Sequence, residues 1–75
     1  MINTPERRDE IIRLVGEKGR VTVKDLSEMF DVSAVTIRND LNFLEKKGLA
    51  HRAYGGALRW DTVAFDIAIR EKEKL

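Results

Sequence analysis

The sequence predicts a small, mainly α domain in which three helices are followed by one β-hairpin. Three observations support this fold class. Apolar residues recur at helical spacing in three consecutive segments, a residue that can cap a helix precedes each segment, and a Gly-Gly pair separates two short strand-like runs. The chain has 75 residues, which is enough for one domain with a modest core.

The first helix is expected at about residues 5–17. Thr4 is a suitable N-cap, and Pro5 occupies the first helical position, where its missing backbone N–H is not needed. Gly19 is a typical C-terminal stop. Apolar residues at i, i+3 and i+4 spacing form the buried face: Ile11, Leu14 and Val15.

A helix-turn-helix is predicted at about residues 21–40. The β-branched run 21–23 is either a tight strand or the lead into the second helix, and Thr22 with Asp25 resembles a capping box. The apolar stripe of the second helix consists of Leu26, Met29 and Phe30.

The third helix follows a short connection, in which Val32 is expected to point inward, and it runs from the Ser33 cap to about Lys47. Its core-facing residues are Ile37, Leu41 and Leu44. The opposite face is polar and basic and contains no acid: Val35, Arg38, Asn39, Asn42 and Lys46, with Thr36 at its edge. Asp40 and Glu45 lie near the flanks of the core-facing stripe.

A β-hairpin is predicted at about residues 49–60, because two strand-like runs flank Gly55-Gly56 and glycine supplies the positive φ of tight turns. A hairpin directly after the third helix is a wing, so the sequence predicts a winged helix-turn-helix over residues 1–60. Residues 61–75 combine strand-like alternation with a helix-favouring charged end, which leaves their conformation open.

The positive charge is concentrated in the middle of the chain. The formal net charge is only +1, but residues 33–60 carry five Lys or Arg against two Asp or Glu, a local charge of +3. A polyanionic partner is therefore expected to meet the third helix and the wing. An excess of this size is also common in ordinary domains.

Several function classes are disfavoured. The chain has no cysteine, and its single histidine, His51, has no partner at metal-ligand spacing. No nucleophile–base pair or glycine-rich phosphate loop is present, so we expect neither an enzyme nor a cofactor. Neither an apolar run of about 20 residues nor a signal peptide occurs. A cytoplasmic location without membrane contact is expected.

Double-stranded DNA is the predicted partner, because the third helix offers groups that match base edges. Arg38 can donate to guanine O6 and N7, or it can simply pair with Asp40 or with a neighbouring helix. Asn39 can pair with adenine, and Val35 can contact a thymine methyl or pack against the second helix. The predicted DNA contacts are Ser33, Val35, Thr36, Arg38, Asn39, Asn42, Arg52 and Tyr54.

The remaining candidates face backbone phosphates. Ser33 and Thr36 lie at a helix N-terminus, which favours anions, although capping alone explains Ser33. Arg52 is the expected wing contact, and Tyr54 either reaches the DNA backbone or packs over the hairpin. Trp60 is expected to pack rather than to stack on bases.

The chain resembles DeoR-family bacterial transcription regulators. The resemblance rests on Arg7-Arg8 with Ile11-Ile12, Gly19-Arg20-Val21, the run from Val32 to Glu45, and Arg52 with Gly55-Gly56-Ala57. It implies a repressor of a carbohydrate, specifically amino-sugar, utilisation operon. Residues 61–75 would link this domain to a missing C-terminal domain that senses a sugar phosphate and forms homo-oligomers. Asn39 departs from the family, which often has a basic residue there.

Two other hypotheses remain open. A winged helix used for protein–protein contact predicts an apolar exposed face on the third helix. An RNA-binding winged helix predicts exposed aromatic residues for stacking, and the third helix has only Phe43.

Overall fold

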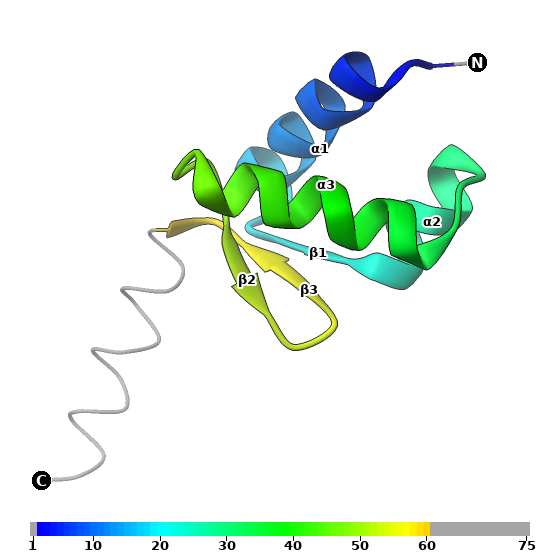
Figure 1. The fold of residues 1–75 in the computed structure, drawn as a ribbon. Coiled ribbons are helices and arrows are strands. Elements are labelled where there is room, and N and C mark those ends of the chain that lie inside the picture. The colour runs from blue at the N-terminus through cyan, green and yellow to red at the C-terminus, as the bar shows by residue number, and fades with distance from the viewer. Residues whose placement is uncertain (1, 61–75) are drawn as a thin grey trace, which may run out of the picture.

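The computed structural model describes residues 2–60, and the predicted linker at 61–75 lies outside these residues. Within residues 2–60, three helices and three short strands form the winged helix-turn-helix that the sequence predicts (Figure 1). In chain order the elements are α1 (Thr4–Lys18), β1 (Arg20–Thr22), α2 (Val23–Phe30), α3 (Ala34–Lys46), β2 (His51–Ala53) and β3 (Gly56–Leu58).

Helix α1 begins one residue earlier than predicted. Its N-cap is Asn3, whose side-chain oxygen accepts a hydrogen bond from the backbone N–H of Glu6 at 3.0 Å. Thr4 was wrong as the cap because its hydroxyl lies inside the first turn and accepts from Arg7 at 3.4 Å. Gly19 ends the helix as expected, in the left-handed conformation with φ 76°.

Helices α2 and α3 pair through a tight turn. Thr22 caps α2 by accepting from the N–H of Asp25 at 3.1 Å, and Ser33 caps α3 by accepting from the N–H of Thr36 at 3.1 Å. Between them, Asp31 takes a left-handed conformation with φ 53°, which turns the chain sharply. Both predicted caps of the helix-turn-helix are therefore confirmed.

The apolar stripe of α2 differs from the prediction. Its buried residues are Val23 and Leu26, with Phe30 half-buried, whereas Met29 is 53% exposed. At about 100° per residue, Met29 lies about 90° from the centre of that stripe. The prediction for Met29 was wrong because Val23 belongs to the helix and shifts its buried face.

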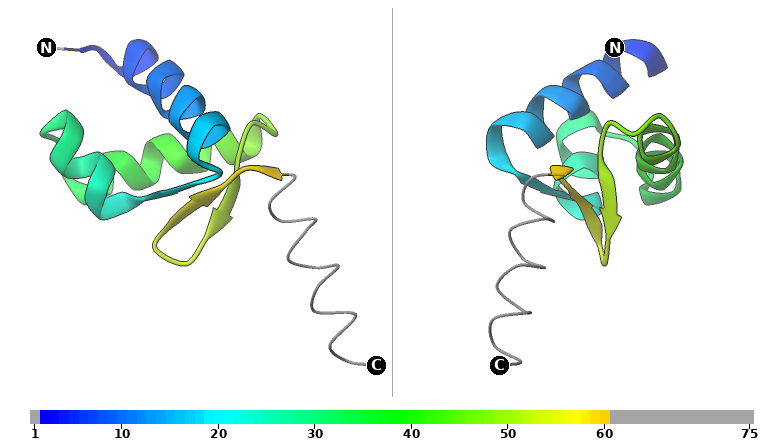
Figure 2. Two further views of the ribbon diagram at one scale, coloured as in Figure 1. Left: turned by 180° about the vertical axis from the view of Figure 1, so that it is seen from behind. Right: turned by 90° about the vertical axis from the view of Figure 1, so that its left-hand side faces the viewer.

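The wing belongs to a three-stranded antiparallel sheet rather than to an isolated hairpin. The strand order is β1-β3-β2, so the segment before α2 pairs with the last strand. Two further backbone hydrogen bonds extend the pairing of these two segments: the Val23 N–H donates to the Gly55 carbonyl at 2.8 Å, and the Arg59 N–H donates to the Gly19 carbonyl at 2.9 Å. Figure 2 shows the hairpin projecting beyond the helices.

The turn of the wing lies at Tyr54-Gly55, one residue earlier than predicted. Gly55 supplies the positive φ of 76°. Gly56 instead starts β3 and is needed for close approach, because a Cβ atom there would lie 1.9 Å from the carbonyl oxygen of Val21. The two glycines therefore serve different purposes.

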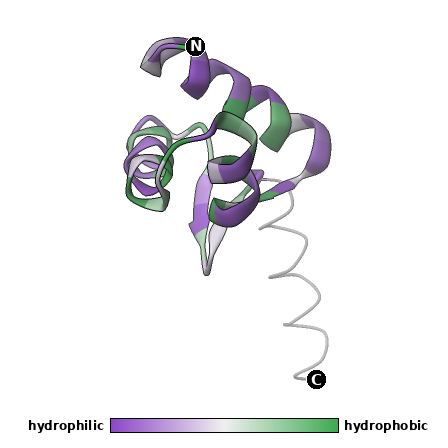
Figure 3. Ribbon diagram, turned by 90° about the vertical axis from the view of Figure 1, so that its right-hand side faces the viewer, coloured by the Kyte–Doolittle hydropathy of each residue, from purple (hydrophilic) through white to green (hydrophobic). Residues whose placement is uncertain are grey.

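The core lies where the three helices meet the sheet. Figure 3 shows hydrophilic and hydrophobic stretches alternating along the helices, as expected when each buries one face. All predicted core residues of α1 and α3 are buried. The core consists of Ile11, Leu14, Val15, Val21, Val23, Leu26, Ile37, Leu41, Leu44, Ala50 and Ala57.

Candidate nucleic-acid interface

The outward face of α3 is open to solvent, as the sequence predicts. Val35 is 62% exposed, so most of its side chain is available to a partner. Arg38, Asn39 and Asn42 are also exposed, and none of the three makes a side-chain hydrogen bond within residues 2–60. Helix α3 crosses the front of the molecule in Figure 1, above the wing.

The hydroxyls at the start of α3 form a small local network. Ser33 Oγ accepts from the Thr36 N–H and also lies 3.0 Å from Thr36 Oγ1. Ser33 is exposed, and Thr36 is half-buried. The capping role of Ser33 is thus established, and both hydroxyls lie at the exposed, positively polarised end of the helix dipole.

Asp40 is buried in an ion cluster that sequence reasoning missed. The Asp40 carboxylate, 1% exposed, accepts from Nε and Nη2 of Arg7, the latter at 3.1 Å, and from Nε of Arg8 at 2.9 Å. Hydrogen bonding to this carboxylate raises the pKa of the Arg7 guanidinium. The alternative pairing of Asp40 with Arg38 was therefore wrong, because two arginines of α1 occupy the carboxylate.

A signal for this cluster exists in the sequence. Arg7 precedes Ile11 by four residues and therefore lies on the same face of α1 as the core stripe. An arginine on a buried face requires a buried acid, and Asp40 is the acid of α3 nearest its core-facing stripe.

Glu45, the second acid of α3, ties the helix to the wing. Its carboxylate accepts from the backbone N–H of Arg52 at 2.8 Å and lies 3.9 Å from Nδ1 of His51. Because Asp40 and Glu45 both point toward other parts of the domain, the outward face of α3 presents only neutral and cationic side chains.

Arg52 projects from the wing toward α3. The register pairs Arg52 with Ala57 and Ala57 with Val21, so the three share a face of the sheet. Ala57 and Val21 are buried in the core, whereas Arg52 is on the edge strand and stays half-buried. Its Nη1 donates to the carbonyl of Arg38 at 3.4 Å, which places the guanidinium beside α3.

The other wing side chains divide into exposed and packed ones. Tyr54 is fully exposed at the tip, so the alternative that it packs over the hairpin was wrong. Trp60 packs as predicted: its ring lies 4.8 Å from that of His51, and its Nε1 donates to the Gly48 carbonyl at 3.0 Å.

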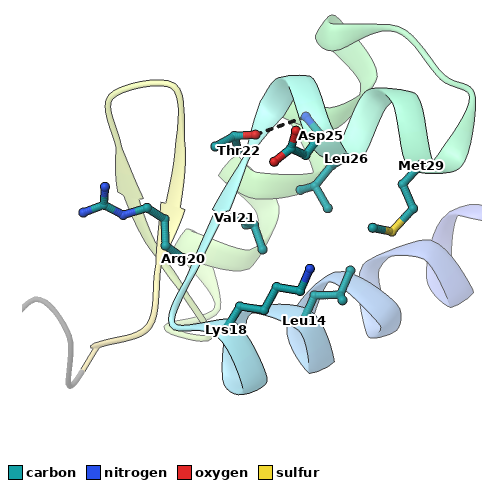
Figure 4. Close-up of a pocket in the computed structure, with 8 residues that line it drawn as sticks. All are labelled: Leu14, Lys18, Arg20, Val21, Thr22, Asp25, Leu26 and Met29. Carbon is teal, nitrogen blue, oxygen red and sulfur yellow. Dashed lines mark hydrogen bonds between the residues drawn. The ribbon is translucent and has the colours of Figure 1, made fainter.

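A small pocket lies between α1, β1 and α2 (Figure 4). Its volume is about 40 Å³, far below the roughly 300–1,000 Å³ typical of small-molecule sites. Among residues 2–60, no cluster of three or more His, Asp or Glu side chains is arranged to hold a metal ion. In the same part of the chain no helix is long and apolar enough to cross a membrane.

Several curated proteins similar to this chain are named as repressors. The chain is 51% identical over 74 residues to the "Putative aga operon transcriptional repressor" of Escherichia coli O157:H7, covering 96% of this chain and 28% of that protein. It is 52% identical over 58 residues to the "Putative galactitol utilization operon repressor" of Escherichia coli K12, covering 77% and 52%. It is 40% identical over 73 residues to a "Lactose phosphotransferase system repressor" of Staphylococcus aureus, covering 97% and 29%.

The chain therefore spans between about a quarter and a half of the length of these relatives. The sequences of α3 and the wing predict a likeness within the family to the N-acetylgalactosamine-operon repressor, and the first of these similarities agrees with that prediction. No solved structure matches the chain. The family described as "DeoR-like helix-turn-helix domain" matches residues 7–63, and the chain belongs to this family.

Proposed function

We propose that this chain is the sequence-specific DNA-binding domain of a transcriptional repressor of a carbohydrate utilisation operon. The observation that carries the proposal is the outward face of α3, on which Arg38, Asn39 and Asn42 are exposed while both acids of the helix point elsewhere. Such a face suits a polyanion and can distinguish base edges.

The recognition helix enters the major groove in this proposal. Arg38 donates two N–H groups to guanine O6 and N7, Asn39 pairs with adenine N6 and N7, and Val35 contacts a thymine methyl. Asn42 lies one turn further along the same face and meets a base edge or the sugar-phosphate backbone. These contacts specify sequence, because each base pair presents a distinct pattern in that groove.

Phosphate contacts fix the orientation of the domain on the duplex. Ser33 and Thr36 meet a phosphate at the N-terminus of α3, where the helix dipole favours an anion. Arg52 projects from the wing toward α3 and neutralises a second phosphate. Tyr54 at the wing tip donates its hydroxyl to the backbone.

In the whole protein, we infer that residues 61–75 link this domain to a C-terminal domain that binds a phosphorylated sugar. Binding of that effector releases the operator, and a homo-oligomer of the protein binds paired half-sites in the cytoplasm. The amino-sugar assignment is supported by the similarity to the aga operon repressor, whereas the relatives named for galactitol and lactose favour other carbohydrates.

Arg38→Ala tests the proposal. On a duplex selected by the wild-type chain from a random pool, we expect the variant to lose about 1–3 kcal/mol of binding free energy and specificity at one base pair. Arg13→Ala is the matched control, because Arg13 pairs with Glu10 and Glu17 on the exposed side of α1. Unchanged affinity of the Arg38 variant would remove this residue from the interface.

Comparing duplex DNA with RNA in a salt series separates the alternatives. DNA binding is expected to weaken steeply with salt, whereas a salt-independent response contradicts the proposal. RNA stacking on α3 is disfavoured, because the ring of Phe43 already carries the Arg8 guanidinium at 4.1 Å from its centroid. The protein–protein alternative is disfavoured by the polar outward face of α3.

A further inference from the structure

The buried ion cluster of Arg7, Arg8 and Asp40 joins α3 to α1. It lies next to the residues of α3 that are proposed to contact bases. Asp40 is adjacent to Asn39 and two residues from Arg38 and Asn42 in the sequence. Its partners, Arg7 and Arg8, lie more than 30 residues earlier, at the start of α1. Any rotation of α3 about its axis that moves the Asn39 side chain must also move the Asp40 carboxylate.

The geometry of the cluster is directional, unlike the apolar contacts around it. Arg7 contacts both oxygens of Asp40 through Nε and Nη2, which fixes the distance and the plane of the carboxylate. Arg8 adds a third bond from Nε at 2.9 Å, and its guanidinium lies over the ring of Phe43, one turn further along α3. Apolar burial between the two helices is non-directional and does not define such an angle.

Stability alone does not account for a buried ion pair. Replacing such a pair with apolar residues of similar size is often neutral or stabilising, so its presence is weak evidence for a stabilising role. Neither Arg7 nor Arg8 is among the proposed DNA contacts, and Arg7 is only 7% exposed and thus inaccessible to a phosphate.

We propose that Arg7, Arg8 and Asp40 are positioning residues that set the orientation of α3, and thereby the discrimination between operator and unrelated DNA. This inference rests on the proposed DNA-binding function and deepens it. It assigns specificity to three residues that touch no base. Disrupting the cluster should reduce affinity for the selected duplex, whereas affinity for unrelated DNA, which depends on surface cations, should be retained.

The test compares affinities for two duplexes, one selected by the wild-type chain from a random pool and one of the same composition in scrambled order. The double variant Arg7→Met/Asp40→Leu replaces the buried pair with apolar side chains and should keep a melting temperature close to wild type. We expect its ratio of selected to scrambled affinity to fall about tenfold, the size of one lost base contact. A folded double variant with the wild-type ratio overturns the inference.

Arg8→Gln keeps the inference testable if the double variant fails to fold, because it leaves the Arg7–Asp40 pair intact and removes a partly exposed side chain. If Arg8 is a positioning residue, Arg8→Gln lowers only the affinity for the selected duplex. A direct phosphate contact lowers both affinities equally and contradicts the inference for Arg8. Arg13→Gln removes the same charge from the exposed side of α1 and should retain the wild-type ratio.

Failure of the proposed function has a different signature. A wild-type chain that selects no duplex and binds DNA of any sequence equally would contradict sequence-specific binding, and the inference falls with it. Selective binding by wild type together with an unaltered ratio in a folded cluster variant contradicts the inference alone.

Discussion

In the proposed function, helix α3 and the wing contact the same DNA, but they are held in place by different means. Helix α3 is fixed by its side chains: Ile37, Leu41 and Leu44 in the core and the Asp40 carboxylate between two arginines. The wing is fixed by its backbone, through the ladder between β1 and β3 and the close approach of Gly56 to Val21. The position of α3 therefore depends on side-chain contacts. The position of the wing depends on backbone pairing between β1 and β3, which requires a glycine at position 56.

Asp40→Ala should have the largest effect on stability. It leaves the guanidinium of Arg7 buried without its counter-ion, which costs about 3–5 kcal/mol of the free energy of unfolding. Denaturant unfolding followed by circular dichroism measures the loss. Glu28→Ala removes an exposed acid of α2 and is expected to retain near wild-type stability. A loss below 1 kcal/mol for Asp40→Ala would mean that the cluster does not hold the helix.

Gly56→Ala tests the wing in the same way. The added Cβ would lie 1.9 Å from the Val21 carbonyl oxygen and 2.9 Å from the Thr22 Cα, so β1 must move away from β3. We expect the free energy of unfolding to fall by about 1–3 kcal/mol, in the range of substitutions that overpack a protein interior.

Gly16→Ala is the matched control for Gly56→Ala. Gly16 lies inside α1, and a Cβ there would have nothing within 4 Å beyond the local helix backbone. The substitution should raise the free energy of unfolding by about 0.5–1 kcal/mol, because alanine has a higher helix propensity than glycine. The two glycine substitutions thus have opposite predicted signs. Equal effects would show that close approach to Val21 is not what β3 requires.

The same contrast explains which features could be predicted from the sequence. Caps and core stripes are local, and the caps at Thr22 and Ser33 and the core face of α3 are confirmed. The pairing of β1 with β3 joins residues far apart in the chain, and no local pattern indicates it. Helical spacing places Asp40 only at the flank of the core-facing stripe of α3. Its contact with Arg7 arises from tertiary packing of α1 on α3.

Glu45 connects the two elements, and its substitution should have a smaller effect. Glu45→Ala removes the acceptor for the Arg52 N–H. We expect the free energy of unfolding to fall by only about 0.5–1.5 kcal/mol, because water can reach this exposed N–H and replace the lost acceptor. Glu45→Gln retains an acceptor oxygen and should lie closer to wild type. A thermal-unfolding comparison of the two variants measures the difference, and equal losses would assign the effect to charge rather than to the hydrogen bond.

Tyr54→Ala should have the smallest effect on stability, within about 0.5 kcal/mol, because the side chain is fully exposed at the wing tip. Its effect on DNA affinity is therefore free of any folding contribution. A phosphate contact from the wing predicts a similar loss of affinity on selected and scrambled duplexes, since backbone contacts carry no sequence information directly. A loss confined to the selected duplex would instead assign base recognition to the wing tip, so that sequence specificity would no longer belong to α3 alone.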